Sequence, residues 1–407
     1  MQKSNKFDVV IVGGGASGLM CAIGAKQKNK NISVAIIEKD DRVGKKLLST
    51  GNGRCNLTHK DITVENYCGS FKKQSKAIFE KYDSDKLLEI FKDLGLLTFC
   101  DNEGRYYPLC KQASAVLDVL RFACDRLNVK IFCSENIRSI KKISKSFSVR
   151  TDGTEFVTKK LVIANGSKAA PKLGGNSSSA DYLKNFSHSF VPFSPALCPV
   201  KVKSDIIKSL KGIRATAKAV LFDKSGEIIK EEVGEVQFTD NSLSGICIFN
   251  LSLYTKKDFL ISLDLLPDIS DRELKSLLYN NKKLFASLTI DNLLTGILQK
   301  RLGQAVLKES KATDFSRKCS ALSVNEIENI VRTIKDMRFP VIENCGFEQA
   351  QCALGGVNGR EIDENTMQSK IVKNLYICGE AIDICGECGG YNLHFAFASG
   401  LTAGENL

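Results

Sequence analysis

Residues 7–41 contain the feature that most limits how this chain can fold, a glycine-rich turn between an apolar run and a helical stretch. The apolar run at residues 7–12 is rich in β-branched side chains, which is typical of a strand buried inside a parallel sheet. Gly13, Gly15 and Gly18 follow it with the spacing G-x-G-x-x-G. In such a unit the first glycine permits the tight turn, the second lets the backbone approach a pyrophosphate, and the third brings the helix close to the sheet. The pattern therefore predicts a βαβ unit that binds a dinucleotide.

A second apolar run at residues 32–37 leads to Glu38, which stands 20 residues after Gly18. A carboxylate at this distance can accept hydrogen bonds from both hydroxyls of an adenosine ribose, and it would repel a 2′-phosphate. A helix that begins at Ala16 and Ser17 directs free N–H groups and the positive end of its dipole at the phosphates. A purely structural βαβ unit is the alternative, and the motif by itself does not separate FAD from NAD.

Length and composition indicate a soluble globular protein with more than one domain. A chain of 407 residues is too long for one ordinary core, which predicts two or three domains. A content of 43% hydrophobic and 26% charged residues is typical of soluble proteins, and no run of about 18 uncharged apolar residues could span a membrane. The first predicted strand begins within seven residues of the N-terminus, which leaves no room for a signal peptide, so we expect a cytoplasmic protein.

The 15 cysteines are scattered through a chain without an export signal, so reduced thiols are the expected state. Cys378, Cys385 and Cys388 form the tightest group, and the last two make a C-x-x-C pair. We predict that these cysteines pack and hold no metal, and a redox pair or a metal site is the alternative. Nearby His394 lies in an apolar stretch and is predicted to be packed.

The net charge of +12 raises the question of nucleic acid or membrane binding. The lysines are spread widely, and the chain has neither zinc-finger spacing nor a basic block interleaved with aromatic residues. A solvated lysine-rich surface is therefore favoured over a nucleic-acid or membrane partner.

Prolines and a change of residue pattern indicate where the chain divides. Three of the seven prolines lie in residues 191–200, after a Gly/Ser-rich stretch, which marks a connection between units. Beyond it come alternating segments typical of strands and a hairpin, and then helical spacing over residues 271–335 that predicts two to four helices. We therefore predict an FAD- or NAD-binding domain made of residues 1–191 and 349–407, with residues 192–348 inserted as a substrate or roof domain.

Three predicted strands end at a glycine, near residues 12, 166 and 379. Because the carboxyl ends of strands in a doubly wound sheet meet at the ligand crevice, we expect these three ends to lie together. The fold class is therefore predicted to be α/β and Rossmann-like.

The loop at residues 42–59 directly follows the predicted ribose-binding acid. It contains glycines together with the basic residues Lys45, Lys46 and Arg54. A polar, basic, flexible segment of this kind could wrap the far side of a long anionic ligand. A minimal NAD site needs no such segment, whereas a cofactor with a ribityl chain and a wide ring does, which favours FAD.

At this point the sequence resembles the HI0933-like bacterial flavoproteins, which include the BaiN-like reductases and are often labelled as the aminoacetone oxidase family. The resemblance runs essentially from end to end. Its carriers are GGGASGLMCA at Gly13, GKKLLSTGNGRCNLT at Gly44, VIANGSKAAPKLG at Val162, GEVQFTDNSLSG at Gly234, LGGVNGREIDENTMQSK at Leu354 and NLYICGEAIDICGECGGYNLHFAFASGLTAG at Asn374.

The resemblance implies non-covalently bound FAD in a two-dinucleotide-binding-domain fold, with an inserted mixed β-barrel and helical domain. It implies cofactor contacts at Gly13, Gly15, Ala16, Ser17, Gly18, Glu38, Lys39, Lys45, Lys46, Thr50, Gly51, Asn52, Gly53, Arg54, Cys55, Asn56, Ala164, Gly166, Gly379, Glu380, Asp383, Gly390, Tyr391, Asn392 and Leu393.

Several of these residues also have a plainer interpretation. The helix that starts at Gly390 would face the pyrimidine edge of the flavin, but Tyr391 and Asn392 could equally be a packed aromatic and a helix cap. Arg54 is predicted to contact the cofactor or the substrate. Cys55 is predicted to be a small packing residue rather than a nucleophile.

The function implied is that of an FAD-dependent oxidoreductase acting on a small organic molecule, with reduction of a conjugated enone as the leading hypothesis. An amine oxidase using O₂, and a flavoprotein acting on RNA or with a protein partner, are the alternatives. No second G-x-G-x-x-G follows a strand, so NAD(P)H would bind only transiently. No catalytic residue is assigned among the candidates Asp240, His59 and Tyr391, and Asp240 is one of the positions where this chain departs from the family pattern.

Overall fold

The computed structural model describes residues 3–407, which divide into two compact units. Unit 1 comprises Met1–Ala196 and Phe347–Leu407, and unit 2 comprises Leu197–Gly346. The insert predicted at 192–348 thus begins five residues before unit 2 and ends two residues after it. Both ends of the chain contribute to unit 1.

Unit 1 is built on a seven-stranded sheet in which β7, β2, β1, β10 and β19 run parallel, and β9 and β8 form an antiparallel extension. The strand order is β7-β2-β1-β10-β9-β8, with β19 also on β10. The strands are β1 (Lys3–Val12), β2 (Val34–Ile37), β7 (Lys130–Phe132), β8 (Ile137–Ile143), β9 (Ser146–Thr151), β10 (Thr154–Ile163) and β19 (Leu375–Ile377).

One edge of β10 is shared by two strands. Glu155 to Thr158 pair with β9, whereas Leu161 to Ile163 pair with β19, which arrives from the far end of the chain. The opposite edge pairs with β1 along its whole length, from Lys3 to Val12, so β1 begins earlier than its apolar run predicts.

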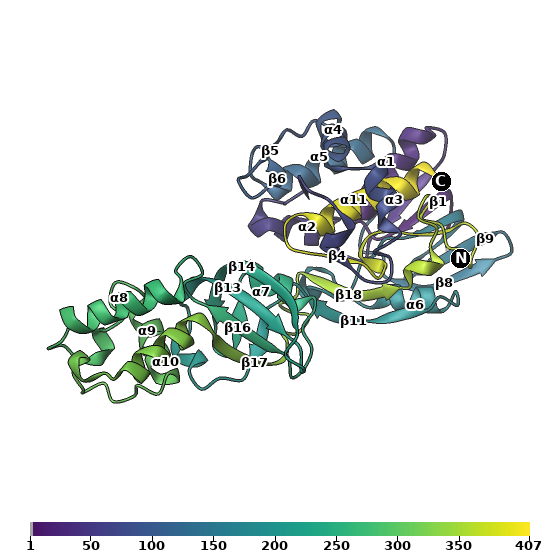
Figure 1. Ribbon diagram of the computed structural model, residues 1–407. Coiled ribbons are helices and arrows are strands. Elements are labelled where there is room, and N and C mark those ends of the chain that lie inside the picture. Colours follow the sequence, from purple (N-terminus) through teal and green to yellow (C-terminus); the bar gives the residue numbers. More distant parts are fainter. Residues whose placement is uncertain (1–2) are drawn as a thin grey trace. The chain divides into compact units, whose positions relative to one another are not determined.

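The nucleotide-type helix α1 (Ala16–Lys28) lies beside the last helix, α11 (Tyr391–Glu405) (Figure 1). Small residues allow this approach. A Cβ added at Gly400 would lie 2.4 Å from the carbonyl oxygen of Ser17, and one at Gly404 would lie 2.4 Å from that of Cys21. The GLTAG stretch therefore serves close helix packing.

Shorter elements surround this core in unit 1. The strands β3, β6 and β5 form a small antiparallel sheet, β4 pairs with β20, and β11 pairs with β18. Their bounds are β3 (Thr58–His59), β4 (Tyr67–Cys68), β5 (Thr98–Cys100), β6 (Arg105–Pro108), β11 (Phe190–Ala196), β18 (Cys352–Val357) and β20 (Cys385–Gly386). The remaining helices of unit 1 are α2 (Lys45–Ser49), α3 (Ser75–Lys81), α4 (Ser84–Asp93), α5 (Ala113–Arg126) and α6 (Ser178–Lys184).

Unit 2 contains a closed six-stranded barrel in the order β12-β15-β14-β13-β16-β17, and every pairing in it is antiparallel. The predicted hairpin is its β13–β14 pair. The strands are β12 (Val200–Val202), β13 (Arg214–Phe222), β14 (Ile228–Phe238), β15 (Ser242–Ser244), β16 (Leu260–Asp264) and β17 (Met337–Asn344).

Helices complete unit 2, and three of them fall in the predicted helical stretch. Two of these three begin with the S-x-x-E capping box, in which Ser270 is paired with Glu273 and Ser323 with Glu326. The helices are α7 (Ile246–Ser252), α8 (Asp271–Leu284), α9 (Lys300–Glu309) and α10 (Val324–Lys335). Within residues 3–407, no helix has the length and apolar character needed to cross a membrane.

Candidate functional site

The three motif glycines after β1 have different surroundings. Gly13 has a φ of +102°, and a Cβ there would lie 2.6 Å from the Ala164 carbonyl oxygen at the end of β10. A Cβ on Gly18 would lie 2.0 Å from the Gly13 carbonyl oxygen. At Gly15, by contrast, no atom of the described residues other than its chain neighbours lies within 4 Å of an added Cβ. The turn therefore packs tightly on both sides of Gly15 and leaves open space at Gly15 itself, where a pyrophosphate would approach.

Glu38 follows β2 and supports the same turn. One carboxylate oxygen accepts a hydrogen bond from the Gly14 N–H at 2.9 Å, and the other accepts one from the Asp40 N–H at 3.0 Å. Each carboxylate oxygen has a second lone pair, so the side chain can still accept ribose hydroxyls. Lys39 beside it is exposed.

The three predicted strand ends do lie together. A Cβ on Gly379, after β19, would lie 2.4 Å from Ser17 Oγ in the first turn of α1. A Cβ on Gly166 would lie 3.9 Å from a carboxylate oxygen of Glu380. Ala164 at the end of β10 is in contact range of Gly13, as described above. Residues from both ends of the chain thus converge on one region of unit 1.

Two buried side-chain oxygens in this region have no hydrogen-bond partner among the described residues, Asn165 Oδ1 and Asn56 Oδ1. Asn165 directly follows Ala164, and its Nδ2 donates to Ser178 Oγ at 2.8 Å. Asn56 Oδ1 lies 2.7 Å from where a Cβ on Gly390 would be. Because buried polar atoms are normally satisfied, these oxygens are acceptors available to a ligand, and they fit a cofactor with many hydroxyl and N–H donors such as FAD. The sequence pattern does not identify Asn165.

The loop after α2 has an unusual backbone. Gly51, Asn52, Gly53 and Cys55 all have positive φ, between 55° and 79°, and Cys55 is fully buried. Burial raises the pKa of the Cys55 thiol to about 12, which agrees with its predicted role as a packing residue. Thr50 starts the loop, and its hydroxyl donates to the Leu47 carbonyl.

The two lysines of this segment are paired with acids. Lys45 Nζ lies 2.6 Å from Asp41 Oδ1, and Lys46 Nζ lies 2.7 Å from Glu380 Oε2. Burial works against the charged form of Lys46, but the Glu380 carboxylate outweighs it, so the pKa of Lys46 lies above its ordinary value. The other Glu380 oxygen accepts the Ala353 N–H at 3.0 Å.

Asp383 is buried and joins two loops, since its carboxylate accepts the Ser70 N–H at 2.9 Å and the Gly355 N–H at 3.1 Å. The resemblance places Glu380 and Asp383 near ribityl and phosphate groups. In the structure both carboxylates also hold neighbouring backbone segments in place.

The side chains at the start of α11 make their contacts with neighbouring protein segments. Asn392 closes the preceding turn, because its Oδ1 accepts the Gly386 N–H at 2.9 Å and its Nδ2 donates to the Gly386 carbonyl at 2.7 Å. Tyr391 is buried and stacks on His59 with ring centroids 5.0 Å apart. Leu393 packs against the core. Tyr391 thus has the contacts of a packed aromatic, whereas Asn392 bonds to the preceding loop and does not cap α11, whose N-cap is Gly390.

The two remaining catalytic candidates have their polar atoms engaged. His59 Nδ1 accepts the Asp61 N–H at 3.1 Å, and Nε2 lies 2.9 Å from the Glu103 carbonyl oxygen. Asp240, in unit 2, is exposed and lies 2.8 Å from Lys211 Nζ. Neither arrangement identifies an acid or base.

Cys385 of the C-x-x-C pair contacts cysteines from two other segments of the chain. Cys385 is buried and lies opposite Cys68 in the β20–β4 pair, and its thiol shares a hydrogen bond with the thiol of Cys352 in β18. The hydrogen bond with Cys352, together with burial, holds the pKa of the Cys385 thiol well above its ordinary value. Cys388 is half-buried. A raised pKa disfavours the thiolate, so Cys385 has the surroundings of a packing residue.

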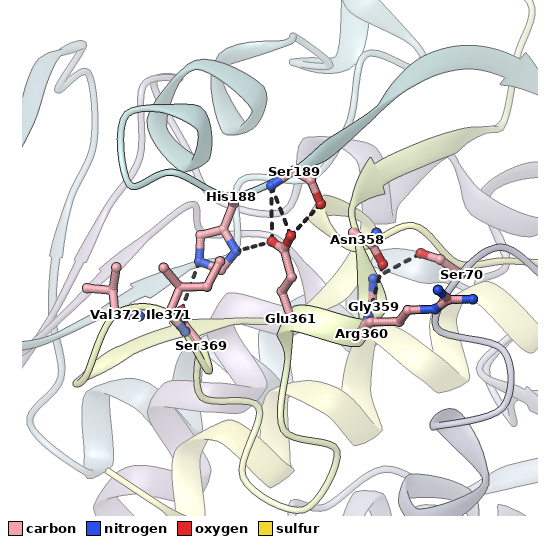
Figure 2. Close-up of polar contacts among 10 residues, drawn as sticks. All are labelled: Ser70, His188, Ser189, Asn358, Gly359, Arg360, Glu361, Ser369, Ile371 and Val372. Carbon is pink, nitrogen blue, oxygen red and sulfur yellow. Dashed lines mark hydrogen bonds and ion pairs between the residues drawn. The ribbon is translucent and has the colours of Figure 1, made fainter.

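A second polar cluster links His188, Glu361 and Ser369, as Figure 2 shows. Glu361 lies 2.8 Å from His188 Nδ1, and Ser369 Oγ lies 2.9 Å from His188 Nε2. This order resembles a nucleophile, base and acid, but Ser369 is buried and its oxygen accepts the Val372 N–H at 2.8 Å. Glu361 also accepts from the Ser189 N–H and hydroxyl. The cluster therefore ties three segments of unit 1 together, and the sequence pattern does not reveal it.

Known proteins are similar to this chain over nearly its whole length. A family model for the HI0933-like protein Rossmann domain matches residues 7–406. A 3-dehydro-bile acid delta(4,6)-reductase of Clostridium scindens is 33% identical over 97% of each chain, and a ribosomal RNA dihydrouridine synthase of Escherichia coli is 28% identical over 99% of this chain and 98% of its own. Among solved structures, the 3-ketosteroid-delta4-(5alpha)-dehydrogenase of Rhodococcus jostii RHA1 aligns with 100% of this chain and 99% of its own, at 13% identity and a TM-score of 0.48. The chain therefore belongs to the HI0933-like family of FAD-dependent oxidoreductases.

Proposed function

We propose that this flavoprotein reduces a carbon–carbon double bond that is conjugated with a carbonyl group in a small organic substrate. The observation that carries the proposal is what two relatives have in common. A 3-dehydro-bile acid with delta(4,6) double bonds is a conjugated ketone, and uridine carries a double bond conjugated with a ring carbonyl. One chemistry, addition of hydrogen across an activated double bond, accounts for both names.

We propose cofactor contacts at the groups of unit 1 that still have unused hydrogen-bonding capacity. The N–H groups at the start of α1 have no carbonyl four residues earlier within the helix, and the open space at Gly15 would receive the pyrophosphate. Glu38 would accept the adenosine ribose hydroxyls. Asn56 and Asn165 would accept hydrogen bonds from donors elsewhere on the cofactor.

FAD, when bound, supplies the hydride transfer. The protein orients the reactants and keeps water out. The Lys46–Glu380 ion pair and the Asp383 bridge hold the loops around the site at fixed spacing. We assign no proton donor, because the polar atoms of His59 are engaged with the backbone.

The proposal is tested with purified protein reduced anaerobically by dithionite. Addition of 2-cyclohexenone or a 4-en-3-one steroid should reoxidise the flavin and yield the saturated ketone, identified by mass spectrometry. The matched control is the saturated ketone itself, which should leave the flavin reduced. If amines reduce the oxidised flavin instead, with peroxide released in air, the protein is an amine oxidase.

A second candidate substrate is a uracil base within RNA. The E. coli ribosomal RNA dihydrouridine synthase aligns with this chain over 98% of its own length. The chain also carries a net charge of +12. Unit 2 also brings exposed cations of two segments close together. Arg301 of α9 donates to the carbonyls of Ser209 and Lys211 at 3.3 Å, so these two segments are in contact. The exposed cations of these segments are Lys208, Lys211, Lys300, Arg301 and Lys308.

Binding to ribosomal RNA fragments distinguishes the two substrates. An RNA enzyme should show an affinity that falls steeply as salt rises, and replacing Lys208, Lys300 and Lys308 together with glutamine should reduce the slope by about 3, roughly one per phosphate contact. Equal salt-dependence slopes in the parent and the triple variant would show that these lysines do not contact RNA phosphates.

A further inference from the structure

Arg54 is exposed yet held in place, and no acidic side chain within residues 3–407 forms an ion pair with it. The two lysines of the same segment are each neutralised, Lys45 by Asp41 and Lys46 by Glu380. Among the described residues, the only hydrogen bond of the Arg54 side chain runs from Nε to the Gly51 carbonyl at 3.3 Å. Its two terminal nitrogens therefore remain available to a ligand.

The backbone around Arg54 is strained in a way that presents this one side chain. Gly51, Asn52, Gly53 and Cys55 have φ of 56°, 55°, 79° and 61°, whereas Arg54 has an ordinary φ of −101°. Positive φ is unfavourable for asparagine and more so for cysteine, and strain of this kind is concentrated at functional sites. Cys55 is anchored in the core immediately after Arg54, with its N–H donating to the Thr50 carbonyl at 3.0 Å.

Below the guanidinium lies a fixed aromatic platform. The Arg54 guanidinium carbon is 4.9 Å from the centroid of the Tyr107 ring, a cation–π distance. Tyr107 is buried in β6 and stacks on Phe99 of β5, with centroids 5.9 Å apart and an interplanar angle of 29°. The platform and the Gly51 carbonyl fix the guanidinium at two points, which reduces the entropy lost when it binds a ligand.

We propose that Arg54 is a catalytic residue that binds the carbonyl oxygen of the substrate while negative charge develops there. This inference rests on the proposed function. A hydride supplied by reduced FAD, which would thereby be oxidised, adds to the β-carbon and forms a C–H bond. The double bond breaks, and its electron pair moves to give an enolate oxygen. A proton from solvent then forms the second C–H bond at the α-carbon. A rigid guanidinium aimed at the oxygen stabilises the charge where it appears.

The test compares Arg54→Gln and Arg54→Lys with Arg121→Gln, a control on the exposed face of α5. In Arg54→Gln we expect kcat/KM for 2-cyclohexenone to fall by about 100- to 1,000-fold, the usual effect of losing an oxyanion-binding donor. Arg54→Lys should recover part of the loss. FAD content should be equal in all variants, and Arg121→Gln should match the parent.

Ligand binding supplies a readout that needs no turnover. 4-Nitrophenolate mimics the enolate, and we expect its Kd, followed by the flavin absorbance, to rise at least tenfold in Arg54→Gln. Nitrobenzene, which lacks the oxygen anion, should bind all variants alike. Tyr107→Leu should weaken phenolate binding less than Arg54→Gln, because it removes support and leaves the cation.

Three results would overturn the inference. One is unchanged phenolate binding in Arg54→Gln, and another is an unchanged kcat/KM. The third is loss of FAD from Arg54→Gln with phenolate binding restored by excess FAD, which would make Arg54 a cofactor ligand. If the parent protein reduces no enone at all, the proposed function fails, while the phenolate titration still decides whether Arg54 binds an oxygen anion.

Discussion

Two glycine-rich turns of unit 1 look alike in sequence and differ in what their glycines do. In the turn after β1, a Cβ on Gly15 would meet no atom of residues 3–407 within 4 Å apart from its chain neighbours, so the glycine leaves room for a ligand. In the turn before α11, a Cβ on Gly390 would lie 2.6 Å from the backbone of Thr58, and one on Gly386 would lie 2.7 Å from the Tyr391 Cβ. There the missing side chain lets protein segments approach one another.

The contrast extends to the polar residues of each turn. No side chain in the described part of the protein caps the first helical turn of α1, and Glu38 leaves lone pairs free. At the second turn, Asn392 bonds to its own loop and Tyr391 stacks on His59. A glycine-rich motif thus identifies close approach, and only the surroundings decide whether the approaching group is a ligand or another part of the protein.

The largest effect is expected from Gly390→Ala. The new Cβ would meet backbone at 2.6 Å, and the φ of +103° is unfavourable for alanine. Together these should lower the free energy of unfolding of the FAD-free protein by about 4 kcal/mol in urea titrations. Gly153→Ala is the control, because nothing lies within 4 Å of its Cβ. Equal stability of the two variants would mean that the second turn is not packed as described.

His394, in the first turn of α11, should make stability depend on pH. Its Nε2 lies 2.9 Å from the Tyr82 carbonyl and its Nδ1 lies 2.8 Å from Thr58 Oγ1, so the ring is held neutral. Burial lowers the pKa of His394 to about 4, below about 6.5 in the unfolded chain. Between these values the unfolded state binds more protons, so stability falls as pH falls from about 6.5 to about 4, by about 3 kcal/mol.

The measurement is the difference in unfolding free energy between the parent and His394→Gln, at pH 7 and at pH 4. This difference should shrink by the amount stated. A difference that does not change with pH would show that folding does not lower the pKa of His394.

Gly15→Val should leave the fold intact and abolish tight cofactor binding. The protein has open space at this position, so the unfolding free energy of the FAD-free protein should change by less than about 1 kcal/mol. FAD affinity should fall roughly a hundredfold, or about 2.7 kcal/mol, because the side chain fills the approach to the pyrophosphate. Fluorescence titration with FAD measures it, and undiminished affinity would place the pyrophosphate elsewhere.

Glu38→Ala should weaken FAD binding by about 2 kcal/mol, the typical cost of losing a charged hydrogen-bond acceptor. Part of this effect comes from the turn itself, since Glu38 accepts the Gly14 N–H. Glu38→Gln keeps an acceptor oxygen and should lose less. Isothermal titration with FAD provides the comparison, and equal affinities in parent and Glu38→Ala would contradict the assignment.

The smallest effect is expected at the C-x-x-C pair. The double variant Cys385→Ser, Cys388→Ser should keep its FAD and its turnover within a few-fold, because the raised thiol pKa of Cys385 disfavours redox chemistry. Anaerobic titration should take up two electrons per flavin in both proteins. Uptake of four electrons by the parent and two by the variant would instead identify a dithiol that exchanges electrons with the flavin.

The first turn could be predicted almost completely, because its signal is local. The strand, the three glycines, the helix and Glu38 all lie within residues 7–38, and the structure assembles them as the spacing indicates. The convergence of the strand ends near Gly13, Gly166 and Gly379 also followed from a general property of doubly wound sheets.

The second turn and the clusters around it could not be predicted from spacing. Cys385 is hydrogen-bonded to Cys352 and lies opposite Cys68, and the Arg54 guanidinium lies over the Tyr107 ring. Each of these partners comes from a segment distant in sequence. Partners of this kind are set by tertiary packing and not by local pattern. For the same reason the barrel of unit 2 could be recognised as strands, while its closure and strand order could not be derived.

The sharing of one edge of β10 by β9 and β19 has a consequence for how the chain is made. During synthesis β10 emerges from the ribosome early, but its partner β19 follows only after about 200 further residues, including all of unit 2. At 5–20 residues per second this delay is on the order of 10 to 40 s. Throughout it, residues 161–163 expose an apolar strand edge, the kind of surface that templates aggregation. Unit 2 has a core of its own and all six barrel strands in one continuous segment, so it can fold while that edge waits. We expect newly made chains to be most vulnerable to misassembly, and most dependent on chaperones, during this interval.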